Sequence, residues 1–239
     1  MRILCVFAHP DDECYCAGTL ARLAKQVTPD ENGRYNDDNQ MRAIYMNNGV
    51  GIRRRTPGQP FKPVKNPNER EITRLKELEL SMELIGIPDY QVYDTPNMRM
   101  DMISQLEVNQ IVEDEIAVFK PDLIITHYGN DLNEDHRRTF TAVKVATRLN
   151  PENKVKAVIS TDNDQSRDIF KPNMFVDISD TLEIKMKSME MYRSEWQAPP
   201  AERNEQTMEI MARYNGYKSG FTTAEIFQIV YLVNPFNLD

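Results

Sequence analysis

Histidines and paired carboxylates carry the chemistry that this sequence offers. Ala8-His9-Pro10-Asp11-Asp12-Glu13 follows directly on the apolar run 3–7, and a short apolar run bounded by proline is typical of a buried strand. His9 and Asp12 are three residues apart, close enough around a turn for an imidazole nitrogen and a carboxylate oxygen to bind one metal ion. Asp11 then points elsewhere, where it can act as a general base toward water. The alternative is that one aspartate only caps the following helix.

The other two histidines belong to a second motif of the same kind. The predicted strand 123–126 ends directly before His127, and His136 lies where the next helix is predicted to open. The chain has three histidines in all, each after a predicted parallel strand, and the carboxyl ends of such strands form the edge where α/β proteins place their sites. His9, Asp12 and His136 therefore make a candidate ligand set that leaves one position open for water, as catalytic zinc requires.

Length, charge and cysteine content restrict the class of protein. The chain has 239 residues, of which 40% are hydrophobic, and a net charge of -8, which argues against binding to nucleic acid or an anionic membrane. No apolar run approaches a membrane span, and the first strand begins without a signal sequence, so we expect a soluble, cytoplasmic protein. Three cysteines, Cys5, Cys14 and Cys16, are no disulfide framework. We favour a role for Cys14 and Cys16 as small buried residues. The alternative is that one of them binds the metal as a thiolate.

Strand and helix patterns alternate along the whole chain, which predicts an α/β fold with a mostly parallel sheet flanked by helices. We expect one domain over 1–239, with 155–239 as a carboxy-terminal helix and strand extension. The predicted helix 69–86 has its apolar residues at helical spacing: Ile72, Leu75, Leu78, Leu80, Met82 and Leu84. Strands are predicted at 3–7, 41–46, 90–93, 123–126, 155–160, 175–178 and 226–233, and helices at 13–26, 69–86, 102–119, 136–146, 182–196 and 202–214.

A long connection, 49–68, separates the second strand from the next helix. It is rich in glycine and proline and carries five cations: Arg53, Arg54, Arg55, Lys62 and Lys65. Because it leaves the carboxyl end of a strand, we expect it to overhang the edge that holds His9. Arg53 and its neighbours are candidates to bind a phosphate or diphosphate on the substrate, and the alternative is a solvated loop without a specific role.

The motifs together resemble the LmbE-like or PIG-L family of metal-dependent N-deacetylases. The resemblance rests on His9-Pro10-Asp11-Asp12-Glu13 and on Asp131-Leu132-Asn133-x-Asp135-His136-Arg137. It extends over nearly the full chain through Thr73-Arg74-x-x-Glu77, Phe170-Lys171-Pro172-Asn173-x-Phe175-Val176-Asp177-Ile178, Tyr192-x-Ser194-Glu195 and Ala224-Glu225-x-Phe227.

The resemblance implies a Rossmann-like three-layer fold and hydrolysis of an acetamide on an amino sugar, usually with Zn²⁺, while Fe²⁺ is another candidate. Transferred by position, His9, Asp12 and His136 resemble the metal ligands and Asp11 the general base. Asp135 is expected to orient a neighbouring histidine by a hydrogen bond. Asp11 would take a proton from the attacking water and return it to the leaving amine.

Two positions depart from the family pattern. Many relatives have a histidine, thought to assist the oxyanion, where this chain has Asn133, and an amide can donate a hydrogen bond but cannot act as an acid. His127 is expected to take over part of that role. In the turn before Arg99 and Asp101, which resemble sugar-binding residues, Asn97 replaces an aspartate, so the identity of the sugar is open.

The sequence therefore predicts a zinc hydrolase that removes an N-acetyl group from a small amino-sugar substrate. A nucleotide- or lipid-linked amino sugar is one candidate substrate. Two alternatives stay open: a deacetylase of a glucosaminide conjugate, and a nucleotide-sugar binding module without catalysis. Asp11 argues against the binding module, because a pure binder needs no base beside the metal. A homo-oligomer is a further expectation.

Overall fold

A seven-stranded sheet forms the centre of the protein in a computed structural model that describes residues 1–27, 40–50, 69–148, 154–163 and 169–233. The strand order is β3-β2-β1-β4-β5-β7-β6. The strands are β1 (Arg2–Phe7), β2 (Gln40–Tyr45), β3 (Tyr90–Val92), β4 (Leu123–His127), β5 (Ala157–Thr161), β6 (Met174–Asp177) and β7 (Ala224–Leu232). The α/β fold class is thus confirmed.

The first five strands are parallel, and the last two complete the sheet in antiparallel pairs with β5 and with each other. β1 pairs with β2 on one side and with β4 on the other, so the chain changes its direction of progress across the sheet between β1 and β4. Such a switch point opens a crevice at the carboxyl ends of the strands, where α/β proteins bind ligands. The residues that follow β1 and β4 lie there.

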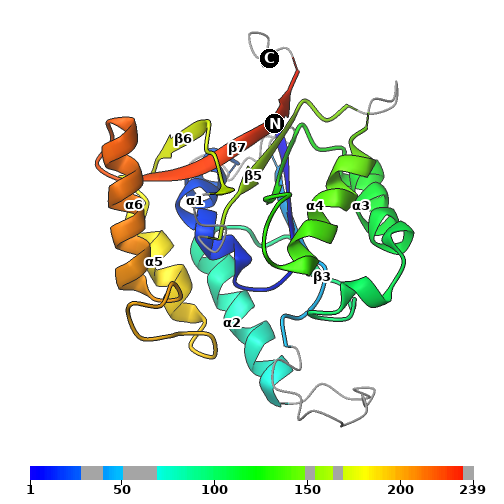
Figure 1. The fold of residues 1–239 in the computed structure, drawn as a ribbon, viewed down its shortest axis with the longest axis horizontal. Helices are drawn as coiled ribbons and strands as arrows, with labels where there is room; N and C mark the ends of the chain where they lie inside the picture. The colour runs from blue at the N-terminus through cyan, green and yellow to red at the C-terminus, as the bar shows by residue number, and fades with distance from the viewer. Residues whose placement is uncertain (28–39, 51–68, 149–153, 164–168, 234–239) are drawn as a thin grey trace, which may run out of the picture.

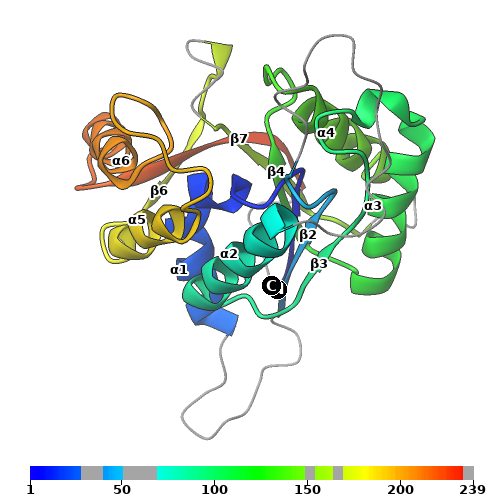
Figure 2. The same ribbon diagram turned by 90° about the horizontal axis from the view of Figure 1, so that it is seen from below.

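Helices cover both faces of the sheet, which gives three layers (Figures 1 and 2). α3 (Gln105–Phe119) and α4 (Glu134–Ala146) pack on one face, whereas α1 (Ala17–Val27), α2 (Glu69–Ile85), α5 (Leu182–Met191) and α6 (Glu205–Ser219) lie on the other. Two 3-10 turns, η1 (Asp12–Cys16) and η2 (Met100–Met102), follow strand ends. No helix among the described residues is long and apolar enough to cross a membrane.

Alternation along β1 divides its side chains between two cores. Ile3, Cys5 and Phe7 face α1 and α2, and Leu4 and Val6 face α3 and α4. This is the period of two that a strand covered on both faces requires.

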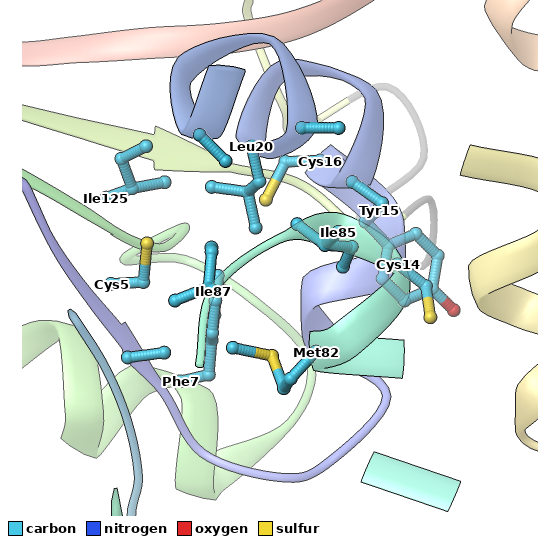
Figure 3. Packing of buried hydrophobic residues seen from close by; sticks show 14 of the residues in the cluster. Cys5, Phe7, Cys14, Tyr15, Cys16, Leu20, Met82, Ile85, Ile87 and Ile125 are labelled. Atoms are coloured by element: carbon cyan, nitrogen blue, oxygen red, sulfur yellow. The ribbon is translucent and has the colours of Figure 1, made fainter. Parts of the chain in front are cut away.

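All three cysteines are fully buried in the first core (Figure 3), with Cys16 beside Leu20 and Cys14 beside Tyr15. Burial raises the pKa of the Cys14 and Cys16 thiols well above their usual value, which suits structural residues rather than thiolates.

Several helices differ from their sequence-based bounds. The helix expected from residue 13 begins as η1 and becomes α-helical only at Ala17, and the helix expected over 182–196 ends at Met191. Of the apolar residues at helical spacing in α2, Leu78 and Met82 are buried, whereas Ile72, Leu75 and Leu80 are exposed. The buried face of α2 also includes polar residues, namely Glu71, Arg74, Glu77 and Ser81. These side chains find hydrogen-bond partners inside the protein, which removes the penalty of burying them.

Candidate metal centre

The turn after β1 presents its first three polar side chains in different directions. Asp11 has φ 105°, in the left-handed region that non-glycine residues rarely adopt, and η1 begins at the next residue. The carboxylate of Asp12 returns to accept a hydrogen bond from the His9 backbone N–H at 2.7 Å. The left-handed step at Asp11 separates its carboxylate from that of Asp12, as two adjacent carboxylates with different roles require.

His9, Asp12 and His136 converge at the carboxyl ends of β1 and β4. His9 Nδ1 lies 3.2 Å from His136 Nε2, which in turn lies 3.2 Å from Asp12 Oδ1. The other Asp12 oxygen lies 3.4 Å from His9 Nδ1. One ligand atom from each residue fits within 4.8 Å of the others, and all three side chains are buried. The structure thus brings together the three residues that the sequence assigned as metal ligands.

The remaining nitrogens of both histidines face carboxylates. His9 Nε2 lies 3.1 Å from Asp135 Oδ2, and His136 Nδ1 lies 2.9 Å from Asp131 Oδ2. If each of these nitrogens carries its proton toward the carboxylate, the two facing nitrogens at 3.2 Å both present lone pairs. Two lone pairs this close need a shared cation or proton between them. Two imidazoles and a carboxylate of this kind fit a divalent metal such as Zn²⁺.

The electrostatics of these side chains point the same way. Although burial opposes it, the neighbouring His136 and His127 hold the pKa of Asp12 well below its usual range. Burial also acts to lower the pKa of His136, but Asp12 and Asp131 raise it to about 10. A protonated His136 would carry its second proton on the nitrogen that is proposed to bind the metal, so metal binding would release that proton.

His127 lies behind the ligands rather than at the cavity. Its ring stacks on that of His136 at 3.9 Å, and its Nε2 accepts a hydrogen bond from the Ala8 backbone N–H at 2.8 Å. Burial, followed by the charge of His136, lowers its pKa, so the ring is neutral. His127 also belongs, with Asp131 and His136, to a second group of possible ligands. In that group His136 would use the nitrogen that faces Asp131, and we read Asp131 instead as its hydrogen-bond acceptor.

Asp11 lies beside the ligand set in a network of ionic hydrogen bonds. Arg203 Nη1 donates to Asp11 Oδ2 at 2.9 Å, and Glu195 accepts from both Arg203 and Arg74. Burial raises the pKa of Asp11 above its usual value, while the charges of Arg203 and Arg74 oppose this shift. A buried carboxylate next to a guanidinium and a metal site is well suited to exchange a proton.

Arg74 supports the same turn through the main chain. Its Nη1 donates to Pro10 O at 3.3 Å, and its Nη2 to Ser194 Oγ at 3.2 Å. Gly49 makes this approach possible: a Cβ there would lie 2.9 Å from Arg74 Nη1, and its φ of +71° favours glycine.

A cavity of about 610 Å³ opens over these residues. It is lined by His9, Asp11, Gly49, Val50, Glu69, Arg70, Thr73, Arg74, Asn97, Met98, Ser194, Glu195 and Arg203. The charged side chains of this lining are three acids and three arginines. The cavity therefore suits a polar ligand of sugar size or larger.

The other predicted site residues lie at different distances from this cavity. Asn97 lines it, but Arg99 and Asp101 are absent from the described lining, and Arg53 falls outside the described residues. Most of the predicted overhanging loop, 51–68, is outside them as well. Asn133 caps α4 by accepting from the Asp135 backbone N–H at 2.9 Å. Its amide oxygen is thereby committed to the helix.

Asp135 has three partners around one buried carboxylate. Besides His9 Nε2, it accepts hydrogen bonds from the backbone N–H groups of Met98 at 2.6 Å and Met100 at 3.1 Å. One side chain thus ties a metal-ligand candidate to the turn that carries Asn97 to the cavity. Met98 has φ 55°, so this turn is held in an uncommon conformation.

Four functional candidates were not assigned a site role from the sequence: Arg74, Asp131, Glu195 and Arg203. Arg74, Asp131 and Glu195 lie inside the motifs that carry the family resemblance, so those motifs could have identified them. Arg203 has no such signal. It lies between Glu202 and Asn204, in a stretch predicted as ordinary helix, and reaches Asp11 across 192 positions of the sequence.

Proteins with curated names align with this sequence over most of its length. A probable N-acetyl-alpha-D-glucosaminyl L-malate deacetylase 2 of Bacillus anthracis is 24% identical over 198 residues, which are 81% of this chain and 81% of the relative. The diacetylchitobiose deacetylase of Thermococcus kodakarensis is 24% identical over 241 residues, or 96% of this chain and 83% of the relative.

Solved structures with the same fold include enzymes of different reactions. The N,N'-diacetylchitobiose deacetylase of Pyrococcus horikoshii with its inhibitor MPG has a TM-score of 0.72 and 22% identity, covering 99% of this chain and 87% of its own. The 4-carboxy-2-hydroxymuconate hydratase GalB of Pseudomonas putida has a TM-score of 0.74 and 17% identity, covering 100% and 99%. These similarities establish the fold, whereas the reaction has to be inferred from the site.

A family model decides the relationship. The model of PIG-L, described as GlcNAc-PI de-N-acetylase, matches residues 4–147, which is more than half of the chain and includes all three candidate metal ligands. The chain belongs to the PIG-L family.

Proposed function

We propose that this protein is a metal-dependent hydrolase that removes the acetyl group from an N-acetylglucosamine-type sugar. One observation carries the proposal: the ligand atoms of His9, Asp12 and His136 converge beside a separate buried carboxylate, Asp11, at the wall of a polar cavity. Ligands plus an adjacent base are what amide hydrolysis by a metal site requires. The names of the curated relatives, which are deacetylases of glucosamine derivatives, support the reaction class.

His9, Asp12 and His136 would hold the metal, and their two imidazoles and one carboxylate favour Zn²⁺, with Fe²⁺ as the other candidate. When bound, the metal supplies Lewis acidity at the acetamide carbonyl and lowers the pKa of water. Asp11 takes the proton of the attacking water and passes it to the leaving amine. Asp135 and Asp131 fix the ring orientations of His9 and His136 through their outer nitrogens.

We assign His127 a supporting role, because its Nε2 accepts a hydrogen bond from the backbone of the ligand-bearing turn. The amide oxygen of Asn133 caps the first turn of α4, and its NH₂ group, 3.6 Å from Met98 Sδ, stays the candidate donor to the oxyanion. Among the described residues, Asn97 is the predicted sugar-binding residue at the cavity wall, and the sugar-binding roles of Asn97, Arg53, Arg99 and Asp101 stay predictions. A single domain over 1–239, a cytoplasmic location and a homo-oligomer also stay predictions.

Two substrate types follow from the relatives, a neutral acetylated chito-oligosaccharide and an acidic glucosaminyl malate conjugate. The described cavity lining favours the neutral type, because three acidic side chains balance three arginines there. Arg74 and Arg203 are both engaged by Glu195. A substrate carboxylate would have to compete with these internal partners.

Acetate release tests the proposal directly. Diacetylchitobiose, N-acetylglucosaminyl malate and UDP-N-acetylglucosamine are offered to the wild type, with bound metal quantified, and to Asp11→Asn. We expect about one metal per chain and acetate release by the wild type. Asp11→Asn should keep the metal and lose about 10²- to 10⁴-fold in kcat. Asp180→Asn, on an exposed aspartate remote from the site, is the matched control and should behave as the wild type.

The alternatives predict other results. A binding module would retain a sugar without releasing acetate, and a hydratase-like enzyme of this fold would bind metal but leave every acetamide intact. Failure to bind any divalent metal would reject the ligand assignment itself.

A further inference from the structure

Arg203 lies in the connection between α5 and α6, yet its guanidinium contacts the carboxylate proposed as the base. Arg203 Nη1 donates to Asp11 Oδ2 at 2.9 Å, and the two residues are 8% and 4% exposed. We propose that Arg203 is a positioning residue for hydrolysis, which holds Oδ2 of Asp11 so that Oδ1 faces the attacking water. This inference rests on the proposed function. It adds a residue from outside the segment matched by the family model, 4–147.

Hydrogen bonds fix the main chain around Asp11, so the freedom that remains is in the torsion angles of its side chain. The Asp11 N–H donates to Glu13 Oε2 at 3.1 Å, and its carbonyl accepts from the Cys14 N–H at 3.2 Å. Its φ of 105° sets where the carboxylate leaves the turn. Within the described part of the chain, Arg203 is the hydrogen-bond donor to that carboxylate. Without it, the Asp11 carboxylate has no fixed rotation in a cavity that opens to solvent.

Arg203 itself is held before any substrate binds. Its carbonyl accepts from the Gln197 N–H at 2.9 Å, and the next residue, Asn204, caps α6 and donates to Gln197 O at 3.1 Å. The guanidinium also donates to Glu195. The connection is therefore closed on itself by hydrogen bonds and presents Arg203 in one orientation.

Glu195 joins this arginine to α2. It accepts from Arg203 and from Arg74, and Arg74 contacts the carbonyl of Pro10 in the turn that carries Asp11. Two arginines thus reach the same turn, one at the Asp11 carboxylate and one at the backbone before it. Both ionic contacts of Arg203 come from Nη1, whose position is fixed by the planar guanidinium, so a flexible lysine ammonium is expected to hold Asp11 less firmly.

Kinetics of Arg203→Gln provide the first test. We expect kcat for acetate release to fall by about 10- to 100-fold, the range of one charge-assisted hydrogen bond, with KM changed by about 2-fold or less. Metal content and the visible spectrum of the Co²⁺-loaded protein should match the wild type, because Arg203 does not touch the ligands. Arg203→Lys should retain an intermediate kcat. Arg213→Gln, on an exposed arginine of α6 that pairs with Glu209, is the control and should leave kcat unchanged.

A double-mutant cycle with Asp11→Asn tests whether Arg203 acts through that carboxylate. In the Asp11→Asn background, Arg203→Gln should change the residual rate by about 2-fold or less, since their effects are coupled. The same four proteins are unfolded in urea, where the two midpoint shifts should be non-additive. An unchanged kcat in Arg203→Gln, an equal further loss in Asp11→Asn, or an altered Co²⁺ spectrum would overturn the proposal. If the wild type releases no acetate, the proposed function fails, and additive urea midpoints then reject the Asp11–Arg203 coupling separately.

Discussion

Asp135→Asn is the substitution whose effect the structure defines most closely. Asp135 Oδ2 accepts from both His9 Nε2 and the Met98 N–H, and Oδ1 accepts from the Met100 N–H. Asparagine keeps the size but replaces one oxygen by an NH₂ group, which only donates. The better of its two orientations keeps the oxygen toward His9 and turns the NH₂ group against Met100. One backbone N–H is then left without an acceptor in a fully buried position.

The magnitude follows from these contacts. One unsatisfied buried donor costs about 1–3 kcal/mol, so we expect the free energy of unfolding to fall by about that amount. His9 also loses a charged acceptor on its outer nitrogen, which fixes the ring and increases its basicity as a ligand. Loss of such an outer partner weakens metal binding by about 10- to 100-fold.

Metal affinity is measured by titrating apo protein with Zn²⁺ or Co²⁺ against a chromophoric chelator, and stability by urea unfolding of the apo protein. Glu134→Gln is the matched control: it removes the same charge one residue earlier, on an exposed side chain that pairs with Arg137. It should change neither quantity measurably. If Asp135→Asn binds metal as tightly as Glu134→Gln does, the orientation of His9 does not depend on Asp135, and our assignment of its ligand nitrogen is wrong.

Three further predictions use the same structure. Gly49→Ala should displace Arg74, lower kcat and lower the free energy of unfolding by about 1–3 kcal/mol. Gly220 is its control, because it has φ +81° but open space around an added Cβ. Gly220→Ala should cost about 1 kcal/mol of backbone strain and leave kcat unchanged. Metal binding should release protons, because neighbouring carboxylates raise the pKa of His136 to about 10. The affinity for metal should therefore rise with pH up to that value. Calorimetry in buffers of different ionisation enthalpy measures the number of protons released. Glu225→Gln should lower the free energy of unfolding by about 3 kcal/mol in urea, since the buried ammonium of Lys185 loses its anionic partner and keeps only the neutral carbonyls of Cys14 and Tyr15. A loss below about 1 kcal/mol would contradict this.

The order of strands and helices was largely readable from the sequence, because apolar runs and helical spacing are local properties. β1, β4 and α4 begin and end close to the predicted positions; His9 and Asp12 follow β1, and His136 lies in the first turn of α4 after β4. The face of α2 was not readable. Its apolar residues have helical spacing, but Arg74 and Glu77 turn inward because partners from the α5–α6 connection and the β1 turn satisfy them there.

By itself, the sequence determined which residues are candidates to bind a metal. His9, Asp12 and His136 follow strand ends, and the carboxyl ends of parallel strands meet wherever such a sheet forms. Only the tertiary structure decided what surrounds Asp11. Arg203 and Asp11 are 192 positions apart, and their contact depends on how the α5–α6 connection packs against the β1 turn. No local pattern encodes that packing, since the same arginine would also be stable in water on a helix surface.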